Sequence, residues 1–95
     1  MYGTIFNLDI KPGHHEALLK VLTEDQATPD GMVAWFVMNP DGKDEWIGVA
    51  VFESKEAHVS NADSPAQHKT FLRIMEHLAS EPTWNDGTYV IGKIA

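Results

Sequence analysis

Alternating and continuous runs of hydrophobic residues predict four β-strands in this chain. Residues 2–10 alternate between apolar and polar or small side chains, and residues 88–94 alternate in a similar way. Residues 32–38 and 45–53 are apolar at nearly every position. Because neighbouring side chains of a strand point to opposite faces, these two central strands are apolar on both faces. Such strands are normally buried on both sides, so the sheet is expected to be covered twice.

Three segments between the strands carry helix signals. The first covers residues 14–26, and the second begins after Ser54 and ends near residue 63. The third begins at Ser64-Pro65, because serine is a suitable N-cap and proline fits the first helical turn. Apolar residues at helical spacing mark the predicted buried faces of the first and third helices. They are Leu18, Val21 and Leu22 in the first, and Leu72, Met75 and Ala79 in the third.

The order of these elements is β-α-β-β-α-β, with a short additional helix before the last long one. Residues 39–42, Asn-Pro-Asp-Gly, are typical of a hairpin loop, so the two central strands are expected to pair antiparallel. This order predicts a single α+β domain over residues 1–95 with the ferredoxin-like fold. In that fold a four-stranded antiparallel sheet carries its helices on one face.

One face of the predicted sheet has no cover, because the helices lie on the other. Either face presents several large apolar side chains, which form a larger patch than a monomer usually exposes. We therefore expect two copies to pack face to face as a two-fold homodimer; the alternative is a monomer that exposes an apolar sheet. Trp46 and Phe52 share one face of their strand, so the position of either residue identifies the face that the helices cover.

Composition excludes several classes of function. The net charge is −7 and there is no basic run, which makes nucleic acid and anionic membranes poor partners. No apolar run reaches the roughly 18 residues that a membrane span needs, and no signal peptide is visible, so a cytoplasmic protein is expected. The absence of cysteine excludes disulfides, thiolate metal sites and a cysteine nucleophile.

Asn7 and His68 are the predicted catalytic residues. Asn7 is a polar residue on an otherwise apolar strand, where its amide can orient a substrate oxygen. His68 lies at helical spacing before Leu72 and Met75, which predicts a place on the buried face of the third helix. An imidazole exchanges its proton near neutral pH, which suits proton abstraction from a phenol or quinol. The structural alternatives are a hydrogen-bonded asparagine at a strand edge and a half-buried histidine in a first helical turn.

A second group of residues is predicted to contact the substrate in the same pocket. His58 and Asn61 are neighbours on one face of the short helix and are placed at the pocket mouth. Three large aromatic residues are predicted to form walls for a planar ligand, although such residues equally suit a core or an interface. They are Trp46, Phe71 and Trp84. Trp84 falls in the predicted loop 81–87, from which it is expected to reach a partner subunit or cover the pocket.

No metal site is predicted. The histidines have no i, i+4 pair, and the combination of His58, Asp63 and His68 fits no standard ligand pattern. His14 and His15 are adjacent, so their side chains diverge by about 100° on a helix and are expected to lie in solvent.

The order of these motifs resembles the antibiotic biosynthesis monooxygenase superfamily. The resemblance rests on the run from Phe52 to His58, on Asn61, and on a helix that starts at Ser64-Pro65 and carries Phe71. It covers most of the chain and implies a dimeric α+β barrel, in which two sheets pack together and each subunit keeps a pocket between its sheet and helices. Some members oxygenate aromatic, quinol or polyketide substrates without a metal, flavin or other prosthetic group, and others degrade haem.

The resemblance implies a cofactor-independent monooxygenase that oxidises a small aromatic, quinol or polyketide-like substrate with dioxygen. In this interpretation His68 removes a substrate proton, and Asn7 holds a substrate oxygen. The alternative is a non-catalytic domain of the same fold that binds a small hydrophobic molecule or serves in assembly. A haem-degrading monooxygenase is the third interpretation.

Overall fold

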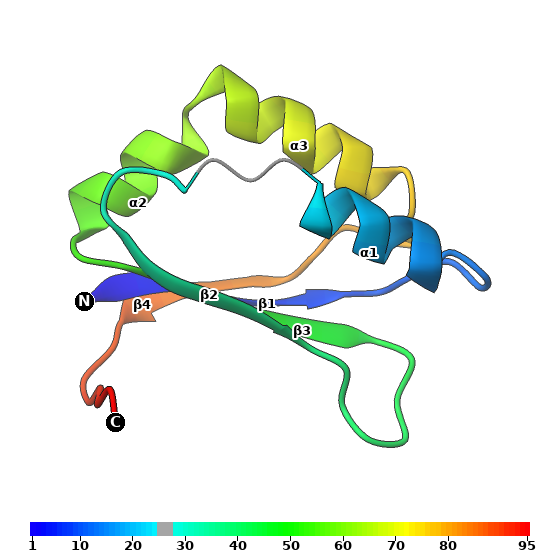
Figure 1. The fold of residues 1–95 in the computed structure, drawn as a ribbon, viewed down its shortest axis with the longest axis horizontal. Helices are drawn as coiled ribbons and strands as arrows, with labels where there is room; N and C mark the ends of the chain where they lie inside the picture. Colours follow the sequence, from blue (N-terminus) through cyan, green and yellow to red (C-terminus); the bar gives the residue numbers. More distant parts are fainter. Residues whose placement is uncertain (25–27) are drawn as a thin grey trace.

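A four-stranded antiparallel sheet carries three helices on one of its faces (Figure 1). The computed structural model describes residues 1–24 and 28–95. The strands lie in the order β2-β3-β1-β4, which is the ferredoxin-like arrangement predicted from the sequence. Among the described residues, no helix has the length and apolar character needed to cross a membrane. In chain order the elements are β1 (Tyr2–Leu8), α1 (His15–Thr23), β2 (Met32–Met38), β3 (Trp46–Phe52), α2 (Lys55–Ala62), α3 (Pro65–Met75) and β4 (Trp84–Thr88).

The even-numbered residues of β1 and β3 form the inner face of the sheet, beneath the helices. The two strands pair so that Leu8 lies opposite Trp46 and Thr4 lies opposite Ala50. Trp46 and Phe52 are 8% and 1% exposed, which identifies their face as the covered one. The opposite face, which we call the open face, carries no helix (Figure 1). Its side chains are those of Ile5, Asn7, Ile47, Val49 and Val51 from β1 and β3, and of Ala34, Phe36 and Met38 from β2.

A β-bulge at Val33 changes which residues of β2 face the helices. Met32 and Ala34, two positions apart, lie opposite successive residues of β3, so Val33 is an additional residue in β2. An added residue reverses the alternation of all the side chains that follow it. A regular alternation would place Met32, Ala34, Phe36 and Met38 on one face, but the bulge separates Met32 from the other three. Trp35 faces the helices, and Phe36 lies on the open face.

The buried core lies at the end of the sheet beneath α1. Leu18, Val21 and Leu22 are buried, which confirms the apolar stripe predicted for the first helix. α1 ends at Thr23, and the predicted helix end at residue 26 lies outside the described residues. The buried side chains that form one cluster are Leu8, Ile10, Leu18, Leu22, Trp46 and Leu78.

The inward face of α3 agrees with the predicted one only at Met75, which packs against the buried cluster. Phe71 and Ile74 are half-buried, whereas Leu72 is 51% exposed. His68, one turn before Leu72, is also exposed. Two apolar stripes offset by one residue run along this helix, and the stripe that contains Phe71 and Ile74 has the bulkier side chains. α3 turns that stripe inwards, so the prediction that placed His68 on the buried face is wrong.

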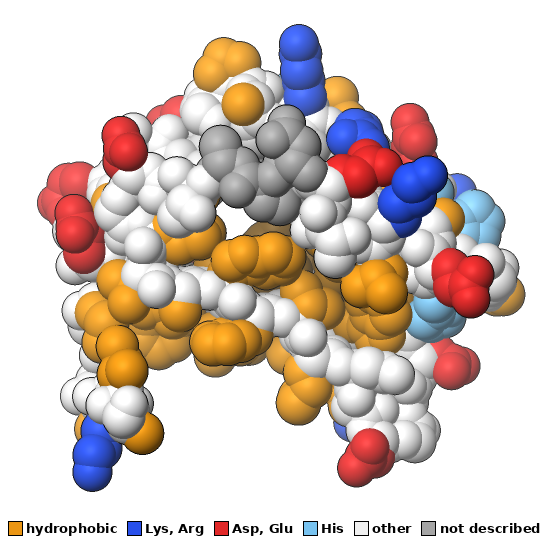
Figure 2. All heavy atoms as spheres, viewed as in Figure 1, with side chains coloured by type: hydrophobic (Ala, Val, Ile, Leu, Met, Phe, Trp, Pro, Cys, Tyr) orange, Lys and Arg blue, Asp and Glu red, His pale blue; other side chains and the backbone are white. Residues whose placement is uncertain are grey.

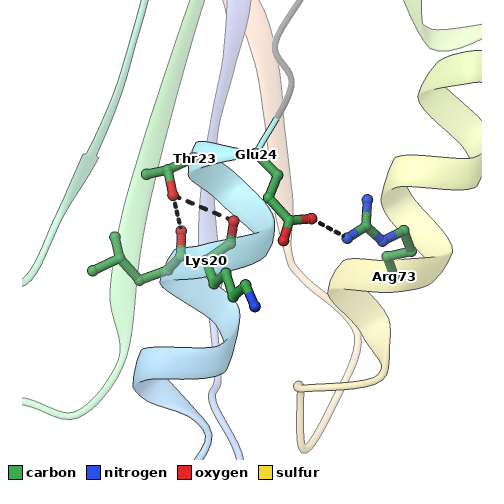
Figure 3. Close-up of polar contacts among 5 residues, drawn as sticks. Lys20, Thr23, Glu24 and Arg73 are labelled. Carbon is green, nitrogen blue, oxygen red and sulfur yellow. Dashed lines mark hydrogen bonds and ion pairs between the residues drawn. The ribbon is translucent and has the colours of Figure 1, made fainter.

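An ion pair joins the end of α1 to α3 (Figure 3). Arg73 donates to the Glu24 carboxylate at 2.5 Å, and both side chains are exposed. The hydrogen bond from Arg73 lowers the pKa of Glu24 below its ordinary value. Beside this pair, the Thr23 hydroxyl donates to the carbonyls of Leu19 and Lys20 at 2.9 and 3.3 Å, and the Lys20 carbonyl also accepts from the Glu24 backbone N–H at 3.0 Å. Because the ion pair is solvated, it contributes little to stability.

β4 lies earlier in the chain than the sequence predicts. The pattern predicts a strand over residues 88–94, but β4 covers Trp84–Thr88 and residues 89–95 lie outside the sheet. Thr88 lies opposite Tyr2, the first residue of β1. The residues after β4 therefore run past the end of β1, where no strand of the described chain lies beside them. Intrinsic strand propensity is not sufficient without such a neighbour.

Replacement of Leu18 by alanine tests the assignment of the core. Leu18 is 0% exposed, whereas its neighbour Leu19 is 52% exposed on the outer side of the same helix. Leu18→Ala should lower the free energy of unfolding by about 2–5 kcal/mol, because it removes a buried side chain and leaves a cavity. Leu19→Ala should change it by less than about 0.5 kcal/mol. Urea unfolding of both variants measures the difference, and similar losses would contradict the orientation of α1.

Candidate ligand site between the sheet and the helices

Aromatic side chains gather on the inner face where β1 and β4 lie side by side. Phe6 lies opposite Trp84 in the sheet register, and their ring centroids are 4.8 Å apart. The ring of Phe71 approaches Trp84 from α3, at a centroid distance of 6.2 Å. A Cβ atom at Gly48 of β3 would lie only 2.2 Å from Phe6 Cζ, so the Phe6 ring lies directly over this glycine. The glycine thus allows Phe6 to lie close to the sheet.

The space between the sheet and the helices is not completely filled. Figure 2 shows an opening between the two layers, with hydrophobic side chains along its sheet side. Trp35 faces this space from β2 and is 40% exposed, and Trp84 at the opposite edge of the sheet is 48% exposed. Aromatic side chains on the covered face of a sheet are normally buried. The two residues lie on the two edge strands, and the exposed part of each ring is available to a small planar ligand.

Two buried polar atoms on the inner face lack a hydrogen-bond partner. Thr4 is 4% exposed and Trp46 is 8% exposed. Within residues 1–24 and 28–95, neither the Thr4 hydroxyl nor the Trp46 indole N–H has a partner. An unpaired buried polar group is costly, and native structures usually satisfy it. Thr4 lies opposite Ala50, which in turn lies opposite Trp35. Of the two unpartnered groups, the Thr4 hydroxyl is therefore the one in the same cross-strand row as Trp35.

His58 packs against the inner face at the α2 end of the sheet. Its ring lies 5.5 Å from Tyr2 and 5.3 Å from Phe52, and both of these residues are on the inner face. The Ser54 hydroxyl fixes the start of α2, because it accepts a hydrogen bond from a backbone N–H of the first turn at 3.1 Å. Asn61, one turn after His58, is half-buried. Contact of His58 and Asn61 with a ligand stays a prediction.

Asn7 and His68 do not meet in one site. Asn7 lies on the open face, and its side-chain carbonyl accepts a hydrogen bond from the backbone N–H of Thr83 at 2.5 Å. This bond matches the structural alternative for Asn7, an asparagine satisfied by backbone. His68 is exposed on α3, which lies over the inner face (Figure 1). The sheet separates the two side chains, so a shared Asn7–His68 pocket within one chain is wrong.

The three predicted aromatic residues have different surroundings. Trp46 is part of the buried cluster beneath α1, where it makes an edge contact with His15 at a centroid distance of 5.6 Å. Trp84 lies in β4 rather than in a loop, so its predicted place is wrong. It nevertheless packs beside Phe71, which brings two of the three predicted residues together.

Sequence reasoning missed Phe6 and Trp35 on the inner face, and Thr4, whose hydroxyl is buried there. The alternation of β1 places Thr4 and Phe6 on one face with the core residues, but the pattern alone does not identify which face carries the helices. The bulge at Val33 hides the orientation of Trp35, because a bulge has no reliable sequence signal.

A contact between two histidines was also missed. His14 is half-buried rather than solvated, and its Nδ1 lies 3.0 Å from the Nδ1 of His77. The two residues are 63 positions apart, so no local pattern could indicate the contact. In the part of the chain that the structure describes, no group of three or more histidine, aspartate or glutamate residues is placed to hold a metal ion.

Replacement of Thr4 by valine tests whether its hydroxyl is unpaired. Valine has nearly the same shape, so Thr4→Val removes a buried unpartnered group without a large cavity. The free energy of unfolding should stay unchanged or rise by about 1–3 kcal/mol, the cost of an unsatisfied buried group. Thr70→Val is the matched control, because the Thr70 hydroxyl donates to the Ala66 carbonyl at 3.2 Å and its loss should not stabilise the protein. Chemical denaturation compares them, and a clear destabilisation by Thr4→Val would contradict the assignment.

Comparison with known proteins bears on the fold. No protein-family model matches the sequence, and no curated protein is similar to it in sequence. Solved structures match over nearly the whole chain. One, from Nitrosomonas europaea, is 10% identical with a TM-score of 0.82, and covers 96% of this chain and 100% of its own. Another, from Chloroflexus aurantiacus J-10-fl, is 21% identical with a TM-score of 0.74, and covers 96% of both chains.

Both of these proteins carry the name "putative antibiotic biosynthesis monooxygenase". A further match from Nitrosomonas europaea, the NE2512 protein, is described as being of unknown function. It is 18% identical with a TM-score of 0.80, and covers 99% of this chain and 93% of its own. The chain thus has the fold that the sequence motifs indicate, and at these identities the likeness shows the fold alone.

Proposed function

We propose that this chain is a member of the antibiotic biosynthesis monooxygenase superfamily and binds a small aromatic or quinol-like molecule between its sheet and its helices. The observation that carries the proposal is the partly exposed aromatic lining of the inner face, with the unpartnered Thr4 hydroxyl in the same sheet region. Apolar walls with a single polar group suit a small aromatic molecule that bears a hydroxyl group. The likeness in fold to proteins named as monooxygenases supports oxidation of that molecule by dioxygen.

The proposed reaction needs no prosthetic group, because an electron-rich substrate can supply the electrons itself. A hydroquinone and dioxygen give a hydroxyquinone and water. One oxygen atom forms a new C–O bond on the ring, and the other leaves as water. The substrate loses as many electrons as the complete reduction of dioxygen requires, so no separate reductant takes part. The protein's task is to bind the substrate and to accept the hydroxyl proton whose loss makes the ring easier to oxidise.

His58 is the histidine that best fits the role of proton acceptor. It contacts inner-face residues, whereas His68 lies on the outer side of α3. A positioned general base must lie within hydrogen-bonding reach of the proton that it removes. We therefore propose His58, in place of His68, as the proton acceptor. Asn7 lies on the open face and does not contact this site in its own chain.

Oxygen uptake with a panel of hydroquinones and dihydroxyaromatics tests the reaction and the base together. If His58 is the base, His58→Gln should lower the rate by about 10²–10⁴, the usual contribution of general-base catalysis. His68→Ala should then retain the rate of the wild-type protein. Loss of activity in His68→Ala alone would restore the sequence-based assignment, and equal rates in all three proteins would remove both histidines from the mechanism.

A non-catalytic binding domain is the second candidate, and the separation of Asn7 from His68 favours it. Quenching of tryptophan fluorescence by the same panel, without any oxygen uptake, would establish this alternative.

A hemin titration addresses the third interpretation, because the absence of a Soret shift would exclude haem binding. If the panel causes neither quenching nor oxygen uptake, the proposed ligand class is wrong.

We also propose that two copies pack through their open faces as a homodimer. Phe36, Met38 and Ile5 are 66%, 55% and 43% exposed on this face. Figure 2 shows hydrophobic side chains along the sheet edge of the molecule. A stable interface buries about 800 Å² on each partner. The apolar side chains that no helix covers thus gain a cover from the second copy.

Sedimentation velocity at micromolar concentration tests the homodimer. The wild-type protein should sediment as a dimer, and Phe36→Asp should raise the dimer dissociation constant at least about 100-fold, because it places an unpaired charge in the interface. Leu72→Asp is the matched control, since Leu72 is exposed to a similar degree on the helix side. A monomeric wild-type protein, or equal weakening by the two variants, would contradict the open-face dimer.

A further inference from the structure

His14 and His77 form a pair of imidazole groups that the proposed function does not use. Their Nδ1 atoms are 3.0 Å apart, although the two residues are separated by 63 positions in the sequence. Both side chains are half-buried, so the protein holds the pair in place and solvent still reaches it. The pair lies at the start of α1, and Figure 2 shows histidine side chains at the surface of this end of the molecule. A ligand from solution can therefore approach both rings.

Backbone hydrogen bonds hold the two segments of the pair together. The His14 N–H donates to the Lys11 carbonyl at 3.0 Å, and the Lys11 N–H donates to the His77 carbonyl at 2.9 Å. Next to this contact, Ile10 and Leu78 form an isolated β-bridge. The backbone thus brings the two histidines together before any ligand arrives, which lowers the entropic cost of binding one.

The distance between the two Nδ1 atoms suits two ligands of one metal ion. Nitrogen ligands lie about 2.0–2.1 Å from Zn²⁺, so two of them at a tetrahedral angle are about 3.3 Å apart. Two such ligands at the right angle of a square-planar ion are about 2.9 Å apart. The observed 3.0 Å lies between these values. An ion lies off the line that joins the nitrogen atoms, so each ring turns about its side-chain bonds to aim its lone pair at the ion.

The charges around the pair are mixed, which favours one class of metal ion. The Lys11 ammonium donates to the Glu76 carbonyl at 3.1 Å and repels a cation. Glu76 and Glu16 supply carboxylates from the residue before His77 and from the first turn of α1, and the net charge of the chain is −7. Transition metals accept the lone pairs of neutral imidazoles, whereas Mg²⁺ and Ca²⁺ need oxygen ligands. The pair therefore fits a transition metal.

We propose that His14 and His77 bind one divalent transition-metal ion through their two Nδ1 atoms, with water at the remaining positions. The usual order of affinity at nitrogen sites places Cu²⁺ above Ni²⁺ and Zn²⁺. The ion joins the start of α1 to the turn after α3. No local sequence pattern indicates this site, because its two ligands are far apart in the chain and no third histidine, aspartate or glutamate of the described residues is placed with them.

Electron paramagnetic resonance of the Cu²⁺-loaded protein tests the ligand set. The wild-type protein should bind one Cu²⁺ per chain, and its spectrum should show coupling to two imidazole nitrogen atoms. Loss of a direct ligand should weaken binding more than loss of a supporting residue, which costs about 10–100-fold. His14→Gln and His77→Gln should therefore each raise the Cu²⁺ dissociation constant at least about 100-fold in a calorimetric titration.

His15→Gln is the matched control for these variants. His15 is adjacent to His14 and is also half-buried, but its Nε2 contacts the Asp44 carbonyl at 3.1 Å. This variant should bind Cu²⁺ as tightly as the wild-type protein does, and an excess of Mg²⁺ should leave the titration unchanged. Far-UV circular dichroism checks that each variant is folded. The nitrogen count in the wild-type spectrum decides the question even if one variant does not fold.

Several results would overturn the site. Absence of Cu²⁺ binding, or a spectrum with a single nitrogen ligand, would contradict binding by the pair. Equal affinity in the wild-type protein and both of the pair's variants would show an adventitious ion only, bound elsewhere on the chain. Neither His14 nor His77 belongs to the proposed ligand site or to the open face, so these results are independent of oxygen uptake and of the dimer.

Discussion

The two central strands are apolar on both faces, but the chain supplies helices for only one of them. This constraint governs the rest of the structure. The inner face receives α1, whose buried leucines pack with Leu8, Trp46 and Leu78. On the open face, the Tyr89 side chain lies beside Gly3 at one corner, and no helix of the described residues covers it. The apolar side chains of the open face are buried only if another molecule covers them. A second copy of this chain is the simplest such cover.

The inner face is itself covered unevenly, and the candidate site follows from that. α1 buries three residues, but α2 and α3 bury none completely. The core is therefore dense at one end of the sheet and thin towards α2 and α3, where aromatic side chains remain partly exposed. A tightly packed helix layer would bury Trp35 and Trp84 and leave no room for a ligand. The ligand site that we propose therefore lies at the loosely covered end of the inner face.

Most of the fold could be predicted from the sequence, because it depends on local patterns. The strand periodicity, the serine caps and the Asn-Pro-Asp-Gly turn each identify one element, and their order identifies the topology. The errors arose where the outcome depends on a tertiary neighbour. Residues 88–94 have strand-like composition but run past the end of β1, and the bulge at Val33 reverses an otherwise regular alternation.

The candidate site was less accessible to prediction for a related reason. His68 was assigned to the wrong one of two apolar stripes that differ by a single position on α3, and Asn7 to a face whose orientation no local signal fixes. For Phe71 and Trp84 the structure shows that the two rings lie close together, and their contact with a ligand stays a prediction. The contribution of Thr4 depends on the absence of a partner, which only the folded structure can show.

The contact between His14 and His77 has a consequence for where hydrogen atoms reside. The two Nδ1 atoms are 3.0 Å apart, and one hydrogen atom is enough to join them. When both rings are neutral, they must therefore be opposite tautomers: one carries its hydrogen on Nδ1 and donates it, and the other carries its hydrogen on Nε2 and accepts. The start of α1 and the turn after α3 are thus joined by a bond whose direction can reverse. Reversal requires both rings to exchange tautomers together, so the hydrogen positions on the two distant segments are coupled.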